Sequence, residues 1–424
     1  MKTVLNLSEA DRRFLADVSQ LAFGNPYGDA TQLVRKTLGG GDVGTHDLAH
    51  AEVRTLLEGL RNQQALSLAD YAEQDRQLLH HALLFDVLHV SCKAFDAMVV
   101  AQVDKKAQVC RAPFIASLLE RMTQIGMAKS VALHYVAIYY QIRRAHYYLD
   151  NVLVGSSASM QKLRHDLWNS IFTHDFALYE RFLWDRMREL TTLFIGGAGV
   201  GKRAAAAAVG YCSYIPFVDK TEVFAESFIS CFTPVRVAKF SGLRLESELF
   251  GHQKMAYAEA LENYQGVFSR CTPAGTIFLD NILEVPSSIQ AQLLGVVQDR
   301  TFAPVGDQVT REFRGRVMAA APGNMETVRN GGLIRSDLFY HLGVNTISIP
   351  SLKQRLQENP ADLELLILHI LGKFTEQSPA QLVGQIIEQM HEHVGHGYDW
   401  PGNLLELEQI VKRILMVSHY ESKG

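Results

Sequence analysis

A glycine-rich turn followed by lysine is the segment of this sequence with the clearest chemical meaning. The letters GGAGVGKR follow a short apolar run and precede an alanine-rich stretch. Glycines let backbone N–H groups curl around a phosphate, the following helix N-terminus adds a positive dipole, and the lysine reaches the terminal phosphates. The G-x4-G-K spacing therefore predicts a phosphate-binding loop built from Gly196, Gly197, Gly199, Val200, Gly201, Lys202 and Arg203.

A carboxylate further along the chain fits the same chemistry. Asp280 ends the apolar run Thr276–Leu279. In nucleotide-binding proteins with such a loop, an Asp at the end of a buried strand helps to hold Mg²⁺ on the phosphates. A strand-end Asp can also cap the next turn, but the loop favours the metal role. We therefore expect ATP or ADP with Mg²⁺ as cofactors, and Asp280 as the metal ligand.

One residue of the loop departs from the usual pattern. Arg203 stands where the standard motif has Ser or Thr, whose hydroxyl helps to hold Mg²⁺. Metal binding is therefore expected to depend on other groups.

Short apolar runs alternate with helical stretches from about residue 152 onward. Strands that alternate with helices predict a mostly parallel sheet covered on both faces. After Pro350 the pattern is helical to the end, so we expect an α/β nucleotide-binding domain over 151–350 and a helical lid over 351–424. The runs are Thr192–Ile195, Val235–Phe240, Thr276–Leu279, Arg316–Ala320 and Val344–Ile349, with a helix predicted over Ser287–Gln298.

Residues 1–150 are expected to form a mainly helical regulatory domain. Apolar residues recur there at spacings of three and four, as in Leu79, Ala82, Leu83 and Val87. The stretch Tyr135–Tyr148 is aromatic and basic, which could serve nucleic-acid stacking. Packing of a buried helix is the favoured interpretation.

Composition places the 424-residue chain among ordinary globular proteins. It is 47% hydrophobic and 20% charged, and its net charge of −4 gives no overall attraction to nucleic acid. The five cysteines form no C-x-x-C pair, so reduced buried thiols are expected rather than metal or redox sites.

The sequence predicts a cytoplasmic protein without a membrane span. Charges interrupt the first apolar stretch, which therefore lacks the core of a signal peptide. The most apolar window, Leu83–Val103, is broken by Asp86, His89, Lys93 and Asp96.

From about Val152 to Ser418 the chain resembles the AAA+ domain of bacterial enhancer-binding proteins, the activators of sigma-54 RNA polymerase. The resemblance implies a P-loop AAA+ fold, nucleotide binding, homo- or hetero-oligomers of AAA+ subunits, and a protein partner that is sigma-54 RNA polymerase or another regulator. The matching segments are SELFGHQK (Ser247–Lys254), GTIFLDNILEVP (Gly275–Pro286), VQDRTFAPVG (Val297–Gly306), RSDLFYHL (Arg335–Leu342) and WPGNLLELEQIVKR (Trp400–Arg413).

The loop through which the family touches sigma-54 is altered. The family's GAFTGA letters correspond here to Met255–Ala260, where two glycines have become Met255 and Glu259 and the threonine has become Ala258. Glycine gives such a loop conformational freedom and threonine gives it a polar contact. These changes argue against the usual contact with sigma-54.

Groups that the family uses for hydrolysis are altered as well. The resemblance assigns Asn281 to the position of the catalytic carboxylate, where an amide cannot take a proton from water but could orient it. Arg335 matches an arginine that acts on the neighbouring subunit's nucleotide, and both are the expected catalytic residues. The remaining departures are Pro322 in sensor I, His341 at a second trans-acting arginine and Leu405 at the sensor II arginine.

The sequence thus leaves open whether the chain is an enzyme. Loss of a general base costs about 10²–10⁴ in rate and loss of an arginine finger about 10³–10⁵. A regulator that acts through nucleotide occupancy, with weak or lost hydrolysis, is the first hypothesis. The alternatives are an active AAA+ ATPase that remodels a partner other than sigma-54, and a structural remnant that binds no nucleotide.

Two further expectations concern short segments. Six residues follow the last matching helix, whereas a helix-turn-helix domain needs roughly 40. We therefore expect no C-terminal DNA-binding domain. His174 and Asp175 could form a catalytic or metal-binding pair, but helix capping is favoured.

Overall fold

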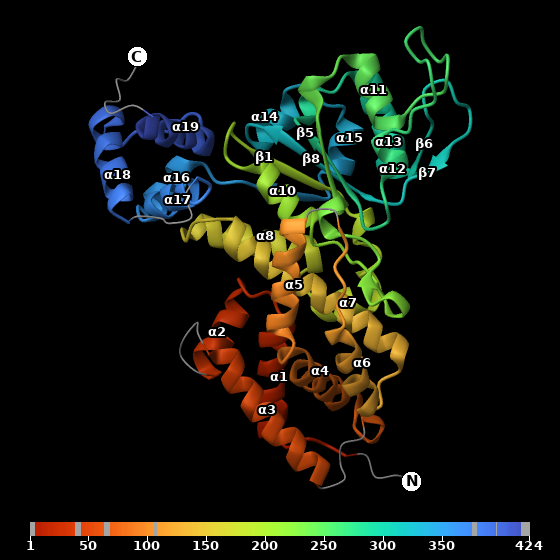
Figure 1. The fold of residues 1–424 in the computed structure, drawn as a ribbon, viewed down its shortest axis with the longest axis vertical. Coiled ribbons are helices and arrows are strands. Elements are labelled where there is room, and N and C mark those ends of the chain that lie inside the picture. Colours follow the sequence, from red (N-terminus) through yellow and green to blue (C-terminus); the bar gives the residue numbers. More distant parts are fainter. Residues whose placement is uncertain are drawn as a thin grey trace. The chain divides into compact units, whose positions relative to one another are not determined.

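The computed structural model describes residues 5–38, 44–62, 68–105, 108–374, 380–395 and 397–416. It consists of two compact units that interleave along the chain (Figure 1). The helical unit comprises 1–144, 172–184 and 214–229, and the sheet unit comprises 145–171, 185–213 and 230–424. The three-domain division at 150 and 350 stays a prediction. The six residues on which the expected lack of a DNA-binding domain depends lie outside the described residues.

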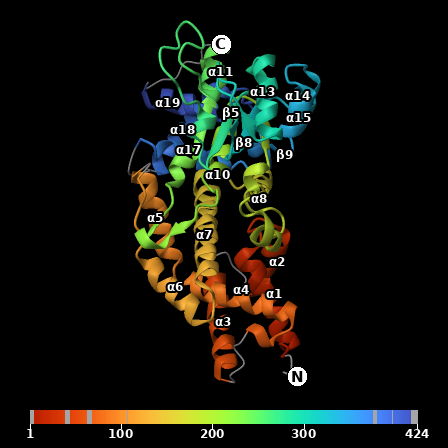
Figure 2. The same cartoon turned by 90° about the vertical axis from the view of Figure 1, so that its right-hand side faces the viewer.

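The helical unit is built mainly from amphipathic helices, as the apolar spacing predicts. In it α4 packs against α1, α3 and α6, which surround it in Figure 2. Their apolar faces meet in a core that includes Leu15, Val18, Val53 and Leu79. The helices are α1 (Glu9–Phe23), α2 (Asp29–Leu38), α3 (Thr45–Asn62), α4 (Glu73–His89), α5 (Cys92–Lys105), α6 (Phe114–Gln124) and α7 (Lys129–His146).

The aromatic and basic stretch forms most of α7 and the start of the turn that follows it, and most of its residues are buried. Tyr140 and Arg144 are both fully buried. The Tyr140 ring stacks on Phe224 with 3.9 Å between centroids, and the Arg144 guanidinium lies 4.2 Å from the Tyr140 centroid. Interior packing is thus confirmed, and these rings are not available for stacking on bases.

The sheet unit contains a five-stranded parallel sheet in the order β4-β5-β8-β1-β9. Continuous apolar runs become strands buried on both faces, and all five residues of β1 are buried. The strands are β1 (Thr192–Gly196), β4 (Phe232–Arg236), β5 (Thr276–Asp280), β8 (Arg316–Pro322) and β9 (Asn345–Ser348). The fold class predicted from the sequence is confirmed.

One predicted strand is misplaced. The sequence predicts a strand over Val235–Phe240, but β4 begins at Phe232 and ends at Arg236. Residues Val237–Lys239 form a 3₁₀ turn instead. Pro234 hid the true start, because proline is tolerated in a strand only at an edge, and β4 is an edge strand.

Helices cover both faces of the sheet (Figure 1). The buried core between them includes Leu193, Val235, Ile277, Leu279 and Val317. The helix predicted over Ser287–Gln298 is α13, with those bounds. The others are α8 (Ala158–Phe172), α10 (Lys202–Gly210), α11 (Gly242–Phe250), α12 (Val267–Arg270), α14 (Met325–Asn330) and α15 (Ser336–Leu342).

The expected helical lid is present, and a buried ion pair fixes it to the segment before α8. Arg355 and Asp362 lie 3.4 Å apart with side chains 3% and 0% exposed. Asp362 also accepts the Ser156 amide at 2.7 Å. Gly155 stands between them with φ +125°, where a Cβ would lie 2.3 Å from the Arg355 guanidinium. The lid helices are α16 (Leu352–Glu358), α17 (Asp362–Leu371), α18 (Ala380–Val394) and α19 (Asn403–Met416).

Three smaller predictions can be compared with the structure. Asp175 caps the short helix α9 (Phe176–Leu178) by accepting two backbone amides, which confirms the capping interpretation. All five cysteines lie in the described ranges and none forms a disulfide; Cys212 and Cys231 are buried, and the other three are half-buried. Within those same ranges, no helix has the length and apolar character that crossing a bilayer requires.

Candidate functional site

The glycine-rich loop lies between β1 and α10, and two of its glycines have left-handed backbones. Gly199 has φ +73° and Gly201, which precedes the first turn of α10, has φ +101°. A Cβ at Gly199 would lie only 2.1 Å from the carbonyl oxygen of Gly402 in the lid. Both the backbone angle and the close approach therefore require glycine at 199.

Lys202 is the first residue of α10 and its ammonium is held by the loop. Nζ donates hydrogen bonds of 2.7 Å to the carbonyl oxygens of Gly196 and Gly197. Burial lowers the pKa of Lys202, whereas the negative charge of Asp280 raises it. The loop thus concentrates one positive charge and the N-terminus of α10 at the end of β1.

A cleft of about 810 Å³ opens over this loop. Because β1, β8 and β5 are neighbours in the sheet, their C-terminal ends meet at the same edge, and they contribute Pro322, Asp280 and Asn281 to the wall. The lid helix α19 closes the other side with Leu404, Leu405 and Glu408. Of the residues predicted for the site, those that line the cleft are Gly199, Val200, Gly201, Lys202, Arg203, Asp280 and Asn281.

Asn281 has a constrained geometry. Its φ is +69°, in the left-handed region that Asn tolerates better than most residues. Its Nδ2 donates a short hydrogen bond to Glu284, while Oδ1 is buried without a partner among the described residues. The amide is thus committed on one side and can accept a hydrogen bond on the other.

Arg335 lies outside the lining of this cleft. It precedes α15 and forms a two-pronged ion pair with Asp337, with contacts of 3.1 and 2.7 Å. The guanidinium lowers the pKa of Asp337 to about 2, and Asp337 raises the pKa of Arg335. The Arg335 side chain is 41% exposed, so it faces solvent within one chain.

Contacts from the lid to the loop were not predicted from the sequence. Asn403 donates from Nδ2 to the Ala198 carbonyl at 2.9 Å, and the Leu404 amide donates to the Gly199 carbonyl at 3.1 Å. Asn403 Oδ1 accepts the Leu352 amide at 2.9 Å. The only sequence signal was the pair Gly402-Asn403, which is typical of a turn with a left-handed residue, and Asn403 has φ +52°.

A smaller cavity of about 200 Å³ adjoins the cleft and was also missed. The two share Val200, Gly201, Ala204, Leu404 and Glu408. The small cavity is otherwise lined by apolar residues together with Arg355, His369 and Lys373. It is formed by the segment before α8, the start of α10 and the lid. Its apolar lining includes Val152, Leu153, Val154, Met160, Leu163, Leu366 and Ile370.

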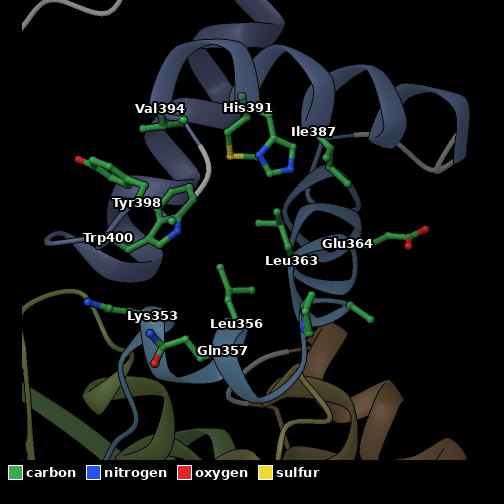
Figure 3. A pocket seen from close by; sticks show the side chains of 15 residues that line it. Lys353, Leu356, Gln357, Leu363, Glu364, Ile387, His391, Val394, Tyr398 and Trp400 are labelled. Atoms are coloured by element: carbon green, nitrogen blue, oxygen red, sulfur yellow. The ribbon is translucent and has the colours of Figure 1, made fainter.

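A third cavity of about 500 Å³ lies within the lid, away from the loop (Figure 3). Leu356, Leu363, Ile387 and Trp400 line it, with His391 at one side. Trp400 has φ +52° and begins the turn that ends at Asn403, so one end of this turn borders the lid cavity and the other end binds the phosphate loop.

The segment that corresponds to the family's sigma-54 loop forms a short closed turn. The Met255 amide donates to the Ala260 carbonyl at 2.7 Å, and Met255 has φ +66° with 83% of its surface exposed. The Tyr257 hydroxyl lies 3.2 Å from the His252 ring. The turn is therefore fixed at its base and presents one large apolar side chain to solvent.

A model of the sigma-54 interaction domain matches residues 179–348. The curated proteins similar to this chain include the phenol regulator MopR of Acinetobacter guillouiae, 32% identical over 55% of this chain and 39% of that protein. The Nif-specific regulatory protein of Azotobacter vinelandii is 31% identical over 65% of this chain and 46% of its own length. ZraR of Salmonella typhimurium is 34% identical over 64% and 54%. The chain thus spans between about two fifths and half of the length of these relatives.

Among solved structures, the chain is similar to NtrX from Brucella abortus. The complex with ADP aligns over 73% of this chain and 63% of NtrX, with 19% identity and a TM-score of 0.46. The complex with ATP aligns over 71% and 62%, with the same identity and TM-score. The likeness is partial.

Proposed function

We propose that the chain, whose residues 179–348 match the sigma-54 interaction domain, is an ATP- or ADP-binding transcription regulator. It acts through homo- or hetero-oligomers of AAA+ subunits and through protein contacts in the cytoplasm. Its partner is sigma-54 RNA polymerase or another regulator. Hydrolysis is weak or lost, so nucleotide occupancy rather than turnover sets the state of the assembly.

The contrast within the cleft is the observation that carries this proposal. The loop keeps its left-handed glycines and Lys202, which serve phosphate binding. The position of the catalytic carboxylate holds Asn281, whose Nδ2 is already engaged with Glu284. Such a cleft can bind a polyphosphate but has no carboxylate at 281 to take a proton from attacking water.

The two adjoining cavities match the two ends of a nucleotide. The phosphates would lie on the loop in the larger cleft, against backbone N–H groups, Lys202 and the N-terminus of α10. The base would enter the apolar cavity beside Val154 and Leu404, since purine rings are flat and largely apolar. Asp280, the carboxylate at the end of β5 that the sequence predicts as a metal ligand, lines the larger cleft.

Arg335 is proposed to act between subunits. It is exposed, and the pairing with Asp337 orients its guanidinium at the surface of the α/β core. In an assembled ring such a group reaches the neighbour's nucleotide, where a guanidinium recognises phosphate oxygens through paired N–H groups. Arg335 would then report nucleotide occupancy across the subunit interface.

The partner surface is proposed to differ from that of ordinary family members. Met255 is exposed in a turn that is closed by a backbone hydrogen bond, and the glycines that would loosen it are missing. An apolar side chain on a rigid turn suits a contact with an apolar partner surface more than a mobile loop would.

Nucleotide-dependent stabilisation tests the proposal directly. The wild type and Lys202→Ala are heated with and without ADP, and Lys239→Ala, which removes an exposed lysine away from the cleft, is the matched control. ADP at about 100 times Kd should stabilise the wild type and the control by about 2.7 kcal/mol. Lys202→Ala should lose this effect. Equal melting of the wild type with and without ADP would favour the structural-remnant hypothesis.

An active ATPase that remodels a partner other than sigma-54 is the second candidate. The Asn281–Glu284 hydrogen bond favours it, because an oriented amide could hold a water molecule and Glu284 lies directly beside it. Steady-state turnover near 1 s⁻¹, within the ordinary range of enzymes, would establish this candidate if Lys202→Ala abolished the turnover.

A further inference from the structure

Arg203 is the second residue of α10 and lines the cleft beside Lys202. Its side chain is exposed. Within the described part of the chain, Arg203 forms no ion pair or hydrogen bond, whereas Lys202 donates to two loop carbonyls. A guanidinium at the first turn of the helix is therefore available to a ligand on the loop.

The residues that line the cleft provide few ligands for a divalent cation. Position 203 lacks the hydroxyl of the standard motif, and position 281 has an amide in place of a second carboxylate. Asp280 is one of two carboxylates in the lining, and the other, Glu408, is paired with Lys412 at 2.6 Å.

Arg203 can supply what a cation would supply to the phosphates. A guanidinium is permanently charged, and its planar set of N–H donors matches two phosphate oxygens at once. Lys202 and Arg203 are the two cationic side chains in the lining of the cleft as described, and both stand at the N-terminus of α10. Two adjacent cations and a helix dipole can offset much of the charge of a diphosphate.

We propose that Arg203 takes the place of the divalent metal by contacting the phosphates next to Lys202, so that the chain binds ADP without Mg²⁺. The inference rests on the proposed function, in which the cleft binds a nucleotide. It replaces the expectation that Asp280 holds Mg²⁺, and it makes Arg203 a phosphate-binding residue.

Calorimetric titration of the full chain with ADP, in excess MgCl₂ and in excess EDTA, tests the inference. For the wild type, Kd should change by less than about threefold between the two buffers. Arg203→Ser removes the guanidinium and restores the hydroxyl of the standard motif. In EDTA this variant should bind ADP roughly tenfold to hundredfold more weakly, the usual effect of losing a charge-assisted hydrogen bond, and MgCl₂ should restore much of the loss.

Arg244→Ser is the matched control, because it removes an exposed arginine of α11 that does not line the cleft. It should titrate like the wild type. Melting temperatures without nucleotide show whether each variant is folded.

The other outcomes separate this inference from the function on which it rests. Wild-type binding that requires MgCl₂ would overturn metal-free binding but leave nucleotide binding intact. Metal-free binding that persists unchanged in Arg203→Ser would overturn the role of Arg203. A wild type that binds ADP in neither buffer would overturn the proposed function itself.

Discussion

The two sides of the cleft are formed by different parts of the chain, one mainly by backbone groups and the other by single side chains. The loop side works through its backbone: Gly199 and Gly201 adopt left-handed angles, and lid residues bind the loop carbonyls directly. The opposite side presents single side chains, Asn281, Pro322 and Leu405, at the positions where the resemblance places the family's catalytic and sensor residues. Under the proposed function, the backbone that binds phosphate is retained while side chains that serve the transition state differ.

The largest effect is expected from breaking the buried Arg355–Asp362 ion pair, which fixes the lid on the loop side of the cleft. Arg355→Ala leaves Asp362 buried and unpaired, which should lower the free energy of unfolding by about 3–5 kcal/mol. Urea denaturation measures this change. Lys353→Ala breaks the exposed pair with Asp399 and should cost less than about 1 kcal/mol. Equal effects of the two changes would contradict the anchoring role of Arg355.

Gly199→Ala tests the close approach of lid and loop. The added Cβ meets the Gly402 carbonyl at a backbone angle that alanine disfavours, at a cost of about 1–3 kcal/mol. ADP affinity, measured by calorimetry, should fall roughly tenfold or more. Gly242→Ala is the matched control, because its added methyl has its nearest heavy atom 4.0 Å away, and it should bind ADP normally. Normal binding by Gly199→Ala would show that the lid moves away at little cost.

Asn281→Glu tests whether the side-chain half of the cleft can be repaired. Glutamate at φ +69° should cost about 1–2 kcal/mol of stability, whereas Asn281→Gly should not suffer this strain. Because Leu405 and Pro322 stay unchanged, we expect ATP turnover to rise by less than about tenfold, since catalytic groups that act as a unit are not restored singly. A larger rise in steady-state hydrolysis would mean that the remaining site is still assembled.

The smallest effect is expected when low pH protonates Asp337 and breaks its ion pair with Arg335. In the folded protein the pKa of Asp337 is lowered from an ordinary 3.8 to about 2. The ion pair therefore stabilises the fold at pH values above 3.8, and this stabilisation is lost as the pH falls toward 2. NMR titration of the carboxyl group should give a midpoint near 2, and Arg335→Gln should return it toward the ordinary value. An unshifted midpoint in the wild type would show that the pair does not persist in solution.

Much of the fold followed from local patterns, and much of the cleft did not. Apolar runs located β1, β5, β8 and β9 because fully buried parallel strands are continuously apolar. The glycine spacing likewise located the glycine-rich loop between β1 and α10. The small cavity beside the cleft and the Asn403–Ala198 contact join segments about 200 residues apart, so no local pattern could indicate them. The positive φ of Asn281 could not be predicted from the sequence either, because asparagine adopts several backbone conformations.

The turn from Trp400 to Asn403 gives the molecule a built-in optical reporter. Trp400 is one of three tryptophans; the residue is 6% exposed beside the lid cavity, and it lies three residues before Asn403, whose side-chain amide donates to the loop. A ligand that displaces the loop would strain or break the Asn403–Ala198 hydrogen bond, and a shift of the turn would change the polarity around the indole. In a chain whose Trp168 and Trp184 are replaced by phenylalanine, the wavelength of tryptophan fluorescence would therefore change when a ligand binds at the loop, without an added dye.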